Sequence, residues 1–485
     1  MPNRDLMSVY AESRPTRRYY GAYAIFCTGY TLDTFDFYVV GFLLAVLGPA
    51  WHLTYGQSGL ILLSAGAGSF AGALVCGGLA DAFGRKAVLV PSTVLCGVGA
   101  ASAALVSDHA WEMFALLRFL VGFGLAGVAT TQMVLLVETT PLHYRTRLVG
   151  FPHVAASLGA LIASISAASM LNVLGWRGVA VLGLVPLLIV VALTMLIIPE
   201  SAQWLISKGR FAKARRSIAA LMQVPAESLP LDARLPTTIA PSAKFRELLA
   251  YPWLLLLVVL AWAGLSTAGF GVYLWGPTIT AALLHITPSE AAHYFVMVAS
   301  AGILGRVLFS LLPIWIGRKN AGAIFGFGIT ATMTAAAFTA HQSLFGVPSF
   351  IVFIVIGALF FDGGYCIVGP YTVEIFPTQM AGRAMGLGQA ANGVGKVAGP
   401  LVLALIAGSG NVLSPHATVA AVLPSFLFLA ACGLAVAIGF TFFAPQDVSE
   451  KAMRAAKKGG RGQETTPQPT TPQPRIETEL QAPQP

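Results

Sequence analysis

Twelve long apolar runs dominate this sequence of 485 residues. A helix needs about 20 mainly apolar residues to cross a lipid bilayer, and each run reaches or approaches that length. Charged residues make up only 10% of the chain, against roughly 25% in soluble domains, so soluble, disordered and collagen-like proteins are excluded. The sequence predicts an all-α membrane protein with transmembrane helices at about 21–47, 57–80, 87–106, 111–136, 148–173, 178–198, 252–283, 291–316, 321–340, 349–373, 385–408 and 420–443.

The positive charges are distributed unevenly over the loops. If the N-terminus lies in the cytoplasm, the 29 Lys and Arg residues fall in loops or tails on that side, with the exceptions Arg118, Arg177, Arg306 and Lys396. Such an excess is typical of the cytoplasmic side of a membrane protein. We therefore expect a multi-pass protein of a cell inner membrane with both termini in the cytoplasm. The net charge of +9 follows from this topology, and no nucleic-acid partner is expected.

Polar stretches divide the chain into five parts. A cytoplasmic tail at 1–20 precedes a six-helix bundle at 21–198, and a basic, Pro-containing loop at 199–251 leads to a second bundle at 252–444. Residues 445–485 contain TTPQP twice in tandem and have too few apolar residues to form a core. A disordered, Pro-rich cytoplasmic tail is expected there.

The sequence lacks the motifs of ATP-driven pumps, metalloproteases and serine hydrolases. Its five cysteines lie in apolar runs without CxxC spacing, which is typical of small core residues. We expect neither an enzyme activity nor a cofactor or metal.

Two short patterns occur once in each half of the chain. Gly84-Arg85-Lys86 recurs as Gly317-Arg318-Lys319, and Glu138-x-x-Pro141 followed by Arg145 recurs as Glu374-x-x-Pro377 followed by Arg383. Repeated six-helix halves around a central loop are the architecture of an alternating-access carrier, whose substrate site lies between the halves at the bilayer midplane.

Several longer segments carry a family resemblance. The segments GGLADAFGRK (77–86), RFLVGFGLAG (118–127), PESAQWLISKGR (199–210) and YTVEIFPTQMAGRAMG (371–386) resemble motifs of the major facilitator superfamily, with Ala82 where an arginine is usual. GYTLDTFDFYVVG (29–41) resembles the D-G-x-D motif of aromatic-acid and related metabolite:proton symporters, with Thr34 in place of the glycine.

This resemblance implies a fold and a function. The fold is two pseudo-symmetric bundles of six transmembrane helices. The function is proton-coupled symport of a small organic solute, in the first place an organic or aromatic acid, by a protein that acts as a monomer in the lipid bilayer. A sugar or organic-cation transporter of the same superfamily is the first alternative, and a non-transporting membrane receptor is the second.

Asp33, Asp36 and Arg118 are the candidate proton-coupling residues. An ionised aspartate at the centre of a span costs about 2.5–3.5 kcal/mol, and the i, i+3 spacing places both aspartates on one helix face. In sugar-porter-like relatives an arginine of the helix-four motif faces a titrating aspartate on helix one, and Asp36 takes that position here. A fixed ion pair, with Arg118 as a static clamp, is the alternative.

The candidate substrate-binding residues are Tyr30, Tyr273, Trp275, Asp362 and Lys396. Lys396 is either the anion receptor of the site or the ion-pair partner of Asp362 or of the helix-one aspartates. The aromatic residues either line the site or simply pack. Arg306 is expected to extend to the inner interface.

A third set lies at helix ends on the cytoplasmic side. The resemblance assigns it to a cytoplasmic gate whose salt bridges break for inward opening: Asp81, Arg85, Glu138, Arg145, Glu374 and Arg383. Lys86, Arg147, Arg318 and Lys319 need no role beyond the topology signal.

Overall fold

A computed structural model describes residues 5–148, 152–230, 248–344, 346–376, 378–411 and 415–445. The described residues up to Pro445 form one compact unit. The predicted disordered tail, from Gln446 onward, lies outside the described residues.

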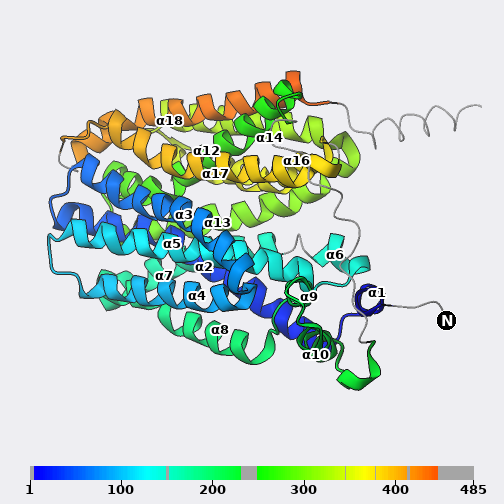
Figure 1. Ribbon diagram of the computed structural model, residues 1–485. Coiled ribbons are helices and arrows are strands. Elements are labelled where there is room, and N and C mark those ends of the chain that lie inside the picture. Colours follow the sequence, from blue (N-terminus) through cyan, green and yellow to red (C-terminus); the bar gives the residue numbers. More distant parts are fainter. Residues whose placement is uncertain are drawn as a thin grey trace, which may run out of the picture. The chain divides into compact units, whose positions relative to one another are not determined.

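The first half of the chain forms six long helices. They are α2 (Arg17–Ala50), α3 (Tyr55–Phe83), α4 (Arg85–Ser102), α5 (Trp111–Thr139), α7 (Pro152–Val181) and α8 (Leu184–Ile197). A short 3-10 turn, η1 (Ala103–Leu105), extends α4, and α6 (Leu142–Leu148) follows α5. The order along the chain can be followed in Figure 1.

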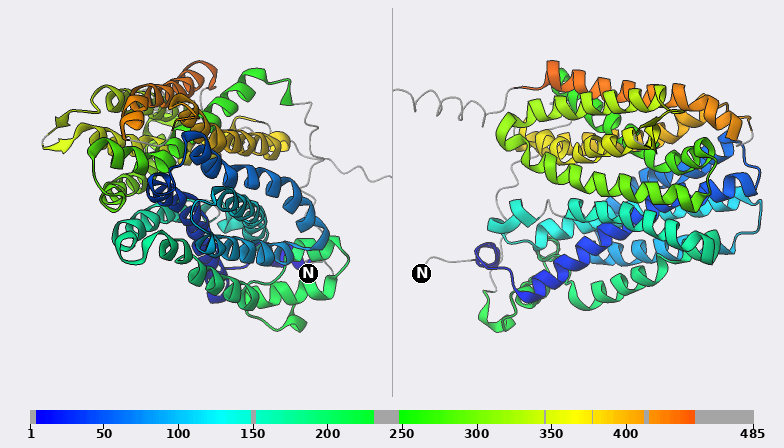
Figure 2. Two further views of the ribbon diagram at one scale, coloured as in Figure 1. Left: turned by 90° about the vertical axis from the view of Figure 1, so that its left-hand side faces the viewer. Right: turned by 180° about the vertical axis from the view of Figure 1, so that it is seen from behind.

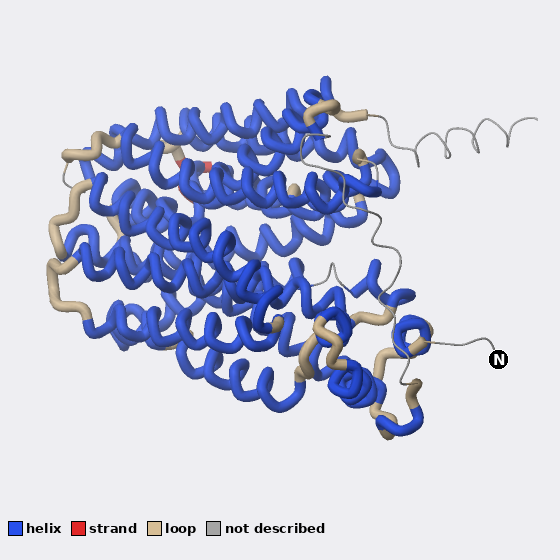
Figure 3. The backbone as a smooth tube through the Cα atoms, viewed as in Figure 1, coloured by secondary structure: helices blue, strands red, loops and turns tan. Residues whose placement is uncertain are grey.

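The second half repeats this arrangement. It contains α12 (Pro252–Leu284), α13 (Pro288–Leu311), α14 (Pro313–Phe338), the broken helix α15 (Ser349–Gly363) and α16 (Tyr365–Glu374), α17 (Thr378–Ile406), and α18 (Pro415–Ile438) with a π-helical turn η3 (Gly439–Phe443). The strands β1 (Ser343–Leu344) and β2 (Val347–Pro348) form a small antiparallel hairpin. Figure 3 shows that most of the described chain is helical.

The predicted membrane spans are confirmed. Eleven helices of the described residues are long and apolar enough to cross a membrane, and the shorter apolar helix Leu187–Ile197 occupies the place of the sixth predicted span. Gly175, with a positive φ of 64°, breaks α7 near its end. The last residues of α7, up to Val181, and α8 therefore occupy the place of the sixth predicted span at 178–198.

Equivalent residues shape the two halves. Gly84 ends α3 with a φ of +116°, and Gly317 breaks α14 with a φ of +78° at the equivalent place, a conformation that favours glycine. Thr54 with Gln57 forms a capping box at the start of α3, and Thr287 with Glu290 forms one at the start of α13. The sequence repeat is therefore a structural repeat.

Three helices of each half build the contact between the halves. α7 packs against α13, α3 against α17, and α2 against α12. Figures 1 and 2 show the second half along one side of the first. Large apolar side chains such as Leu74, Val173, Leu196, Trp315 and Phe442 are exposed on the outer helix faces, as expected of a surface that faces lipid.

The two halves are in contact at one end of the helix bundle. We call this end, where α2 finishes, the distal end. The opposite end, where α2 begins, is the proximal end. The amides of Tyr55 and Gly56 at the start of α3 donate to the carbonyls of Asn411 and Ser409 after α17, each at 2.9 Å. A Cβ atom at Gly59 would lie 2.8 Å from that of Ala404. α3 and α17 thus touch at the distal end.

Toward the proximal end, three glycines of these two helices face open space. A Cβ atom at Gly77 or Gly78 of α3, or at Gly386 of α17, would meet no other atom within 4 Å. The distal closure is supported by the Ser289 hydroxyl, which donates to the Ala168 carbonyl across the halves at 2.7 Å.

Parts of the predicted cytoplasmic tail (1–20) and of the predicted central loop (199–251) form a small helical cluster at the proximal end. α1 (Leu6–Ala11), α9 (Ala202–Ser207), α10 (Phe211–Met222) and the turn η2 (Ala226–Ser228) share a core that includes Leu6, Tyr10, Trp204 and Ile218. The Tyr10 hydroxyl donates to the Thr139 carbonyl at the end of α5. The cluster is thereby attached to the first half.

The closed distal end predicts a specific cross-link. In a chain whose native cysteines are replaced, Gly59→Cys with Ala404→Cys should form a disulfide under mild oxidation, since the two Cβ positions, 2.8 Å apart, reach the roughly 3.5–4.5 Å of a disulfide after a shift of about 1 Å. A protease site inserted between residues 231 and 247 makes the cross-link visible, because oxidised halves stay together on a non-reducing gel. Gly78→Cys with Gly386→Cys is the matched pair at the proximal end. Equal rates of cross-linking in the two pairs would contradict this closure.

Candidate functional site

Asp36 and Arg118 form a buried ion pair between α2 and α5. The Arg118 Nη2 atom lies 3.2 Å from Asp36 Oδ2 and donates to the Asp36 carbonyl at 2.8 Å. Only 8% of Asp36 and 2% of Arg118 are exposed. The two residues face each other, as the family resemblance implied. Their part in proton coupling stays a prediction.

Asp33 lies one turn from Asp36 on α2 and has a different environment. Its side chain is partly exposed and lines a cavity of about 20 Å³ with Thr93, Gln132 and Thr194, a volume sufficient for about one water molecule. Within the described part of the chain, Asp33 makes no hydrogen bond or ion pair. It is therefore the less constrained of the two predicted carboxylates.

Lys396 lies where the halves meet at mid-depth. Its Nζ atom is 5.0 Å from the ring centre of Phe37 on α2 and 5.0 Å from that of Phe270 on α12. The two rings contact each other edge to face at 4.9 Å. Among the described residues no carboxylate lies within ion-pair distance of the ammonium group, so cation–π contacts from both halves hold it.

Asp362 is the partner of Arg306, not of Lys396. The Arg306 Nη2 atom lies 3.1 Å from Asp362 Oδ1, and the Tyr273 hydroxyl donates to Oδ2 at 2.7 Å. The prediction that Arg306 extends to the inner interface is wrong, since only 8% of it is exposed. A buried guanidinium is stable beside a hydrogen-bonded carboxylate, and Asp362 provides one.

The remaining predicted substrate residues differ in position. Tyr30 is partly exposed on α2, one turn before Asp33. Trp275 is 2% exposed, donates from Nε1 to the Pro400 carbonyl at 3.0 Å and stacks on Tyr55. In this conformation Trp275 thus belongs to the distal closure, and Tyr273 is buried beside Asp362.

Four polar residues near Lys396 escaped the sequence analysis. The Ser266 hydroxyl donates to the Asn392 side-chain carbonyl and contacts the Tyr365 hydroxyl at 3.1 Å, and Asn392 donates to Gln389 at 3.1 Å. Gln389 and Asn392 precede Lys396 by seven and four positions, which is the spacing of one helix face. That spacing could have identified them, whereas nothing in the sequence marks Ser266 or Tyr365.

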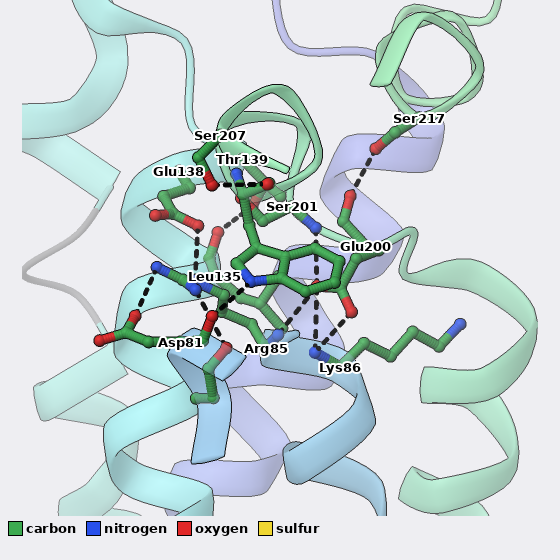
Figure 4. A network of polar contacts seen from close by, with 12 residues as sticks. Asp81, Arg85, Lys86, Leu135, Glu138, Thr139, Glu200, Ser201, Ser207 and Ser217 are labelled. Atoms are coloured by element: carbon green, nitrogen blue, oxygen red, sulfur yellow. Dashed lines mark hydrogen bonds and ion pairs between the residues drawn. The ribbon is translucent and has the colours of Figure 1, made fainter. Parts of the chain in front are cut away.

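At the proximal end of the first half, Arg85 connects two acidic residues. Its Nη2 atom lies 3.0 Å from Asp81 Oδ1 and its Nε atom 3.4 Å from Glu138 Oε2. Figure 4 shows Arg85 between these carboxylates. All three belong to one half, on α3, α4 and α5.

Glu200, which the sequence analysis did not assign, completes this network. Its carboxylate accepts the backbone N–H groups of Arg85 at 3.0 Å, Lys86 at 3.2 Å and Ser201 at 2.9 Å. Lys86 has more than a topological role, because its Nζ atom donates to the carbonyls of Met195 and Ile198 at the end of α8. The Glu200 carboxylate thus compensates the partial positive charge at the N-terminus of α4. The Lys86 ammonium group compensates the partial negative charge at the C-terminus of α8.

The second half has the equivalent pair between Arg318 and Glu374. Arg318 therefore does more than mark the inner side, contrary to the expectation from sequence. Arg383 is partly exposed near the start of α17, and the side chain of Arg145 lies outside the described residues. Each of these pairs joins helices of a single half. Closure of the distal end, which involves contacts between the halves, therefore leaves the pairs intact.

The family model of the Major Facilitator Superfamily matches residues 26–400. The chain is 25% identical over 380 residues to the niacin transporter NiaP of Acinetobacter baylyi, covering 77% of this chain and 84% of NiaP. It is 27% identical over 387 residues to the 4-hydroxybenzoate transporter PcaK of Pseudomonas putida, covering 78% and 84%.

The fold is similar to that of a solved transporter. The inward-open structure of the xylose transporter XylE from E. coli superposes with a TM-score of 0.67 at 17% identity, over 90% of this chain and 99% of XylE. Twelve helices in two repeated halves, with charged residues at mid-depth, define a multi-pass membrane protein of the transporter class. The chain belongs to the Major Facilitator Superfamily, as the sequence motifs indicate.

The Glu200 network predicts a stability effect. Glu200→Ala removes the acceptor for three backbone N–H groups and should lower the free energy of unfolding by about 1–2 kcal/mol. Thermal unfolding in detergent measures the change. Glu227→Ala, at an exposed glutamate of η2, is the matched control. Equal melting temperatures of the two variants would show that the cap contributes nothing.

Proposed function

We propose that this protein is a proton-coupled symporter that carries a small organic acid, in the first place an aromatic monocarboxylate, across a bacterial-type inner membrane by alternating access. The observation that carries the proposal is the Lys396 ammonium, which lies at mid-depth between aromatic rings of both halves without a carboxylate partner among the described residues.

A cation in this position suits an acid substrate. A carboxylate forms charge-assisted hydrogen bonds with an ammonium group, and the adjacent rings of Phe37 and Phe270 suit a flat aromatic body. Relatives named for niacin and 4-hydroxybenzoate transport support this substrate class. An organic cation would be repelled by Lys396. A sugar carries no charge and would leave the Lys396 ammonium group without an ion-pair partner.

The buried carboxylates supply the proton step. Asp36 holds Arg118 while it is ionised, and a proton on Asp36 removes that hold. Protonation therefore changes the energy of the contact between α2 and α5, and can bias one conformation over the other. A receptor without transport has no use for such a pair.

The orientation follows from the charge distribution. Lys and Arg residues are concentrated in the proximal loops, which we assign to the cytoplasm. The distal closure then makes the present conformation the inward-facing one. In this state the charged pairs at the proximal end are formed within each half. They therefore hold each half together as a unit instead of breaking for inward opening, as the family resemblance implied. The two units rock against each other during the cycle.

Substitution of Asp36 tests the coupling. In proteoliposomes, Asp36→Asn should abolish accumulation of 4-hydroxybenzoate driven by a pH gradient, because the neutral amide cannot hold and release Arg118 in response to a proton, while exchange of labelled for unlabelled acid continues. Asp108→Asn, at an exposed carboxylate paired with Arg177 in the loop after α4, is the control. Uphill accumulation by the Asp36 variant would refute its role.

Substitution of Lys396 tests the substrate class. Lys396→Gln should raise the KM for benzoate, 4-hydroxybenzoate and niacin by roughly 10-fold or more, since charge-assisted hydrogen bonds contribute about 1.5–3 kcal/mol. Lys213→Gln, at an exposed lysine of α10, should leave KM unchanged. Counterflow with labelled glucose and choline provides the comparison. Transport of either, without transport of the acids, would contradict an acid carrier.

A further inference from the structure

Six charged side chains lie at mid-depth. Four of them form two ion pairs in direct contact, and the other two have no ion-pair partner among the described residues. Asp36 with Arg118 and Asp362 with Arg306 are in direct contact, so each contributes no net charge. Asp33 and Lys396 remain, and neither has an ion-pair partner among the described residues. Their opposite charges balance the interior at long range.

Phe37 connects the surroundings of these two groups across the halves. Phe37, whose ring lies 5.0 Å from the Lys396 ammonium, follows Asp33 by four positions on α2, so both residues are on the same helix face. Asp33 belongs to the first half and Lys396 to the second.

The other titratable groups near Asp33 leave Lys396 as its available counter-charge. Tyr30 and Asp36 lie on its own helix, Cys96 faces it from α4, and Arg118 on α5 is already bound to Asp36. The α8 residues that line the adjoining cavity are Leu187, Val190 and Thr194, none of which carries charge.

We propose that Asp33 and the carboxylate of a bound substrate compete for Lys396, so that each acid anion that binds causes Asp33 to take up one proton. The inference rests on the proposed acid transport and adds its coupling step. The substrate carboxylate forms the ion pair with the ammonium group, and the proton comes from water on the open side to a carboxylate oxygen of Asp33. No other bond is made or broken.

Charge balance is the physical reason. Before binding, Asp33, Asp36, Arg118 and Lys396 sum to zero. An added anion would leave one uncompensated negative charge in a low-dielectric interior, which is costly. A proton on Asp33 restores neutrality. The water-sized cavity beside Asp33 gives this carboxylate room for contact with a proton donor.

The competition predicts an unusual phenotype for Asp33→Asn. Because the amide does not compete for Lys396, this variant should bind the acid at least as tightly as the unaltered protein at alkaline pH. Its Kd should change by less than about twofold between about pH 6.5 and 8.5, whereas the Kd of the unaltered protein should rise about tenfold per pH unit above the titration of Asp33. A residue with a merely structural role would weaken binding at every pH.

Proton uptake by the full-length protein is measured directly with a pH-indicator dye in weakly buffered detergent solution. Addition of 4-hydroxybenzoate, benzoate or niacin to the unaltered protein should take up about one proton per bound acid, and the uncharged 4-hydroxybenzamide none. Asp33→Asn should bind acid without proton uptake, and Asp108→Asn should behave as the unaltered protein. This readout on the unaltered protein stands even if a variant does not fold.

The outcomes separate the two proposals. Acid binding without proton uptake by the unaltered protein, or an unchanged pH dependence in Asp33→Asn, overturns the competition and leaves acid transport standing. Failure of the unaltered protein to bind any of the three acids overturns acid transport and the competition together.

Discussion

An ionised side chain inside the hydrocarbon layer has to be compensated nearby, because no water is present to solvate it. This constraint explains the interior of the protein better than any single motif. Arg118 and Arg306 each have an aspartate on a neighbouring helix, and both are closed off from solvent. Lys396 lies against two aromatic rings, and no carboxylate among the described residues is in contact with it. Among the charged groups inside the described spans, this cation without a contacting carboxylate lies where the two halves meet.

The sequence was sufficient to predict the helices and their grouping. Membrane spans depend on length and apolarity, both of which are local properties, and the twelve predicted runs correspond to the observed helices. The repeat was visible because Gly84 and Gly317 are needed for the same backbone conformation in both halves. Arg118 opposite Asp36 was predictable because a family motif fixes both positions.

The partners of the other charges were not predictable from the sequence. Arg306 pairs with Asp362, 56 residues further along the chain, and which helix faces which is decided by tertiary packing. Glu200 was overlooked because it acts on backbone N–H groups, which have no sequence signature. Trp275 was assigned to the site by residue type, yet the packing places it in the distal closure.

The attachment of α1 constrains the order of assembly. The Thr16 hydroxyl donates to the carbonyl of Leu221, 205 residues later in the chain, and the core of α1 is completed by α9 and α10. At roughly 5–20 residues per second of synthesis, α1 waits about 10–40 s for these partners while the first six spans enter the membrane. During that interval its apolar face, including Leu6 and Tyr10, is free for a chaperone or for the lipid surface, and its docking marks the completion of the first half.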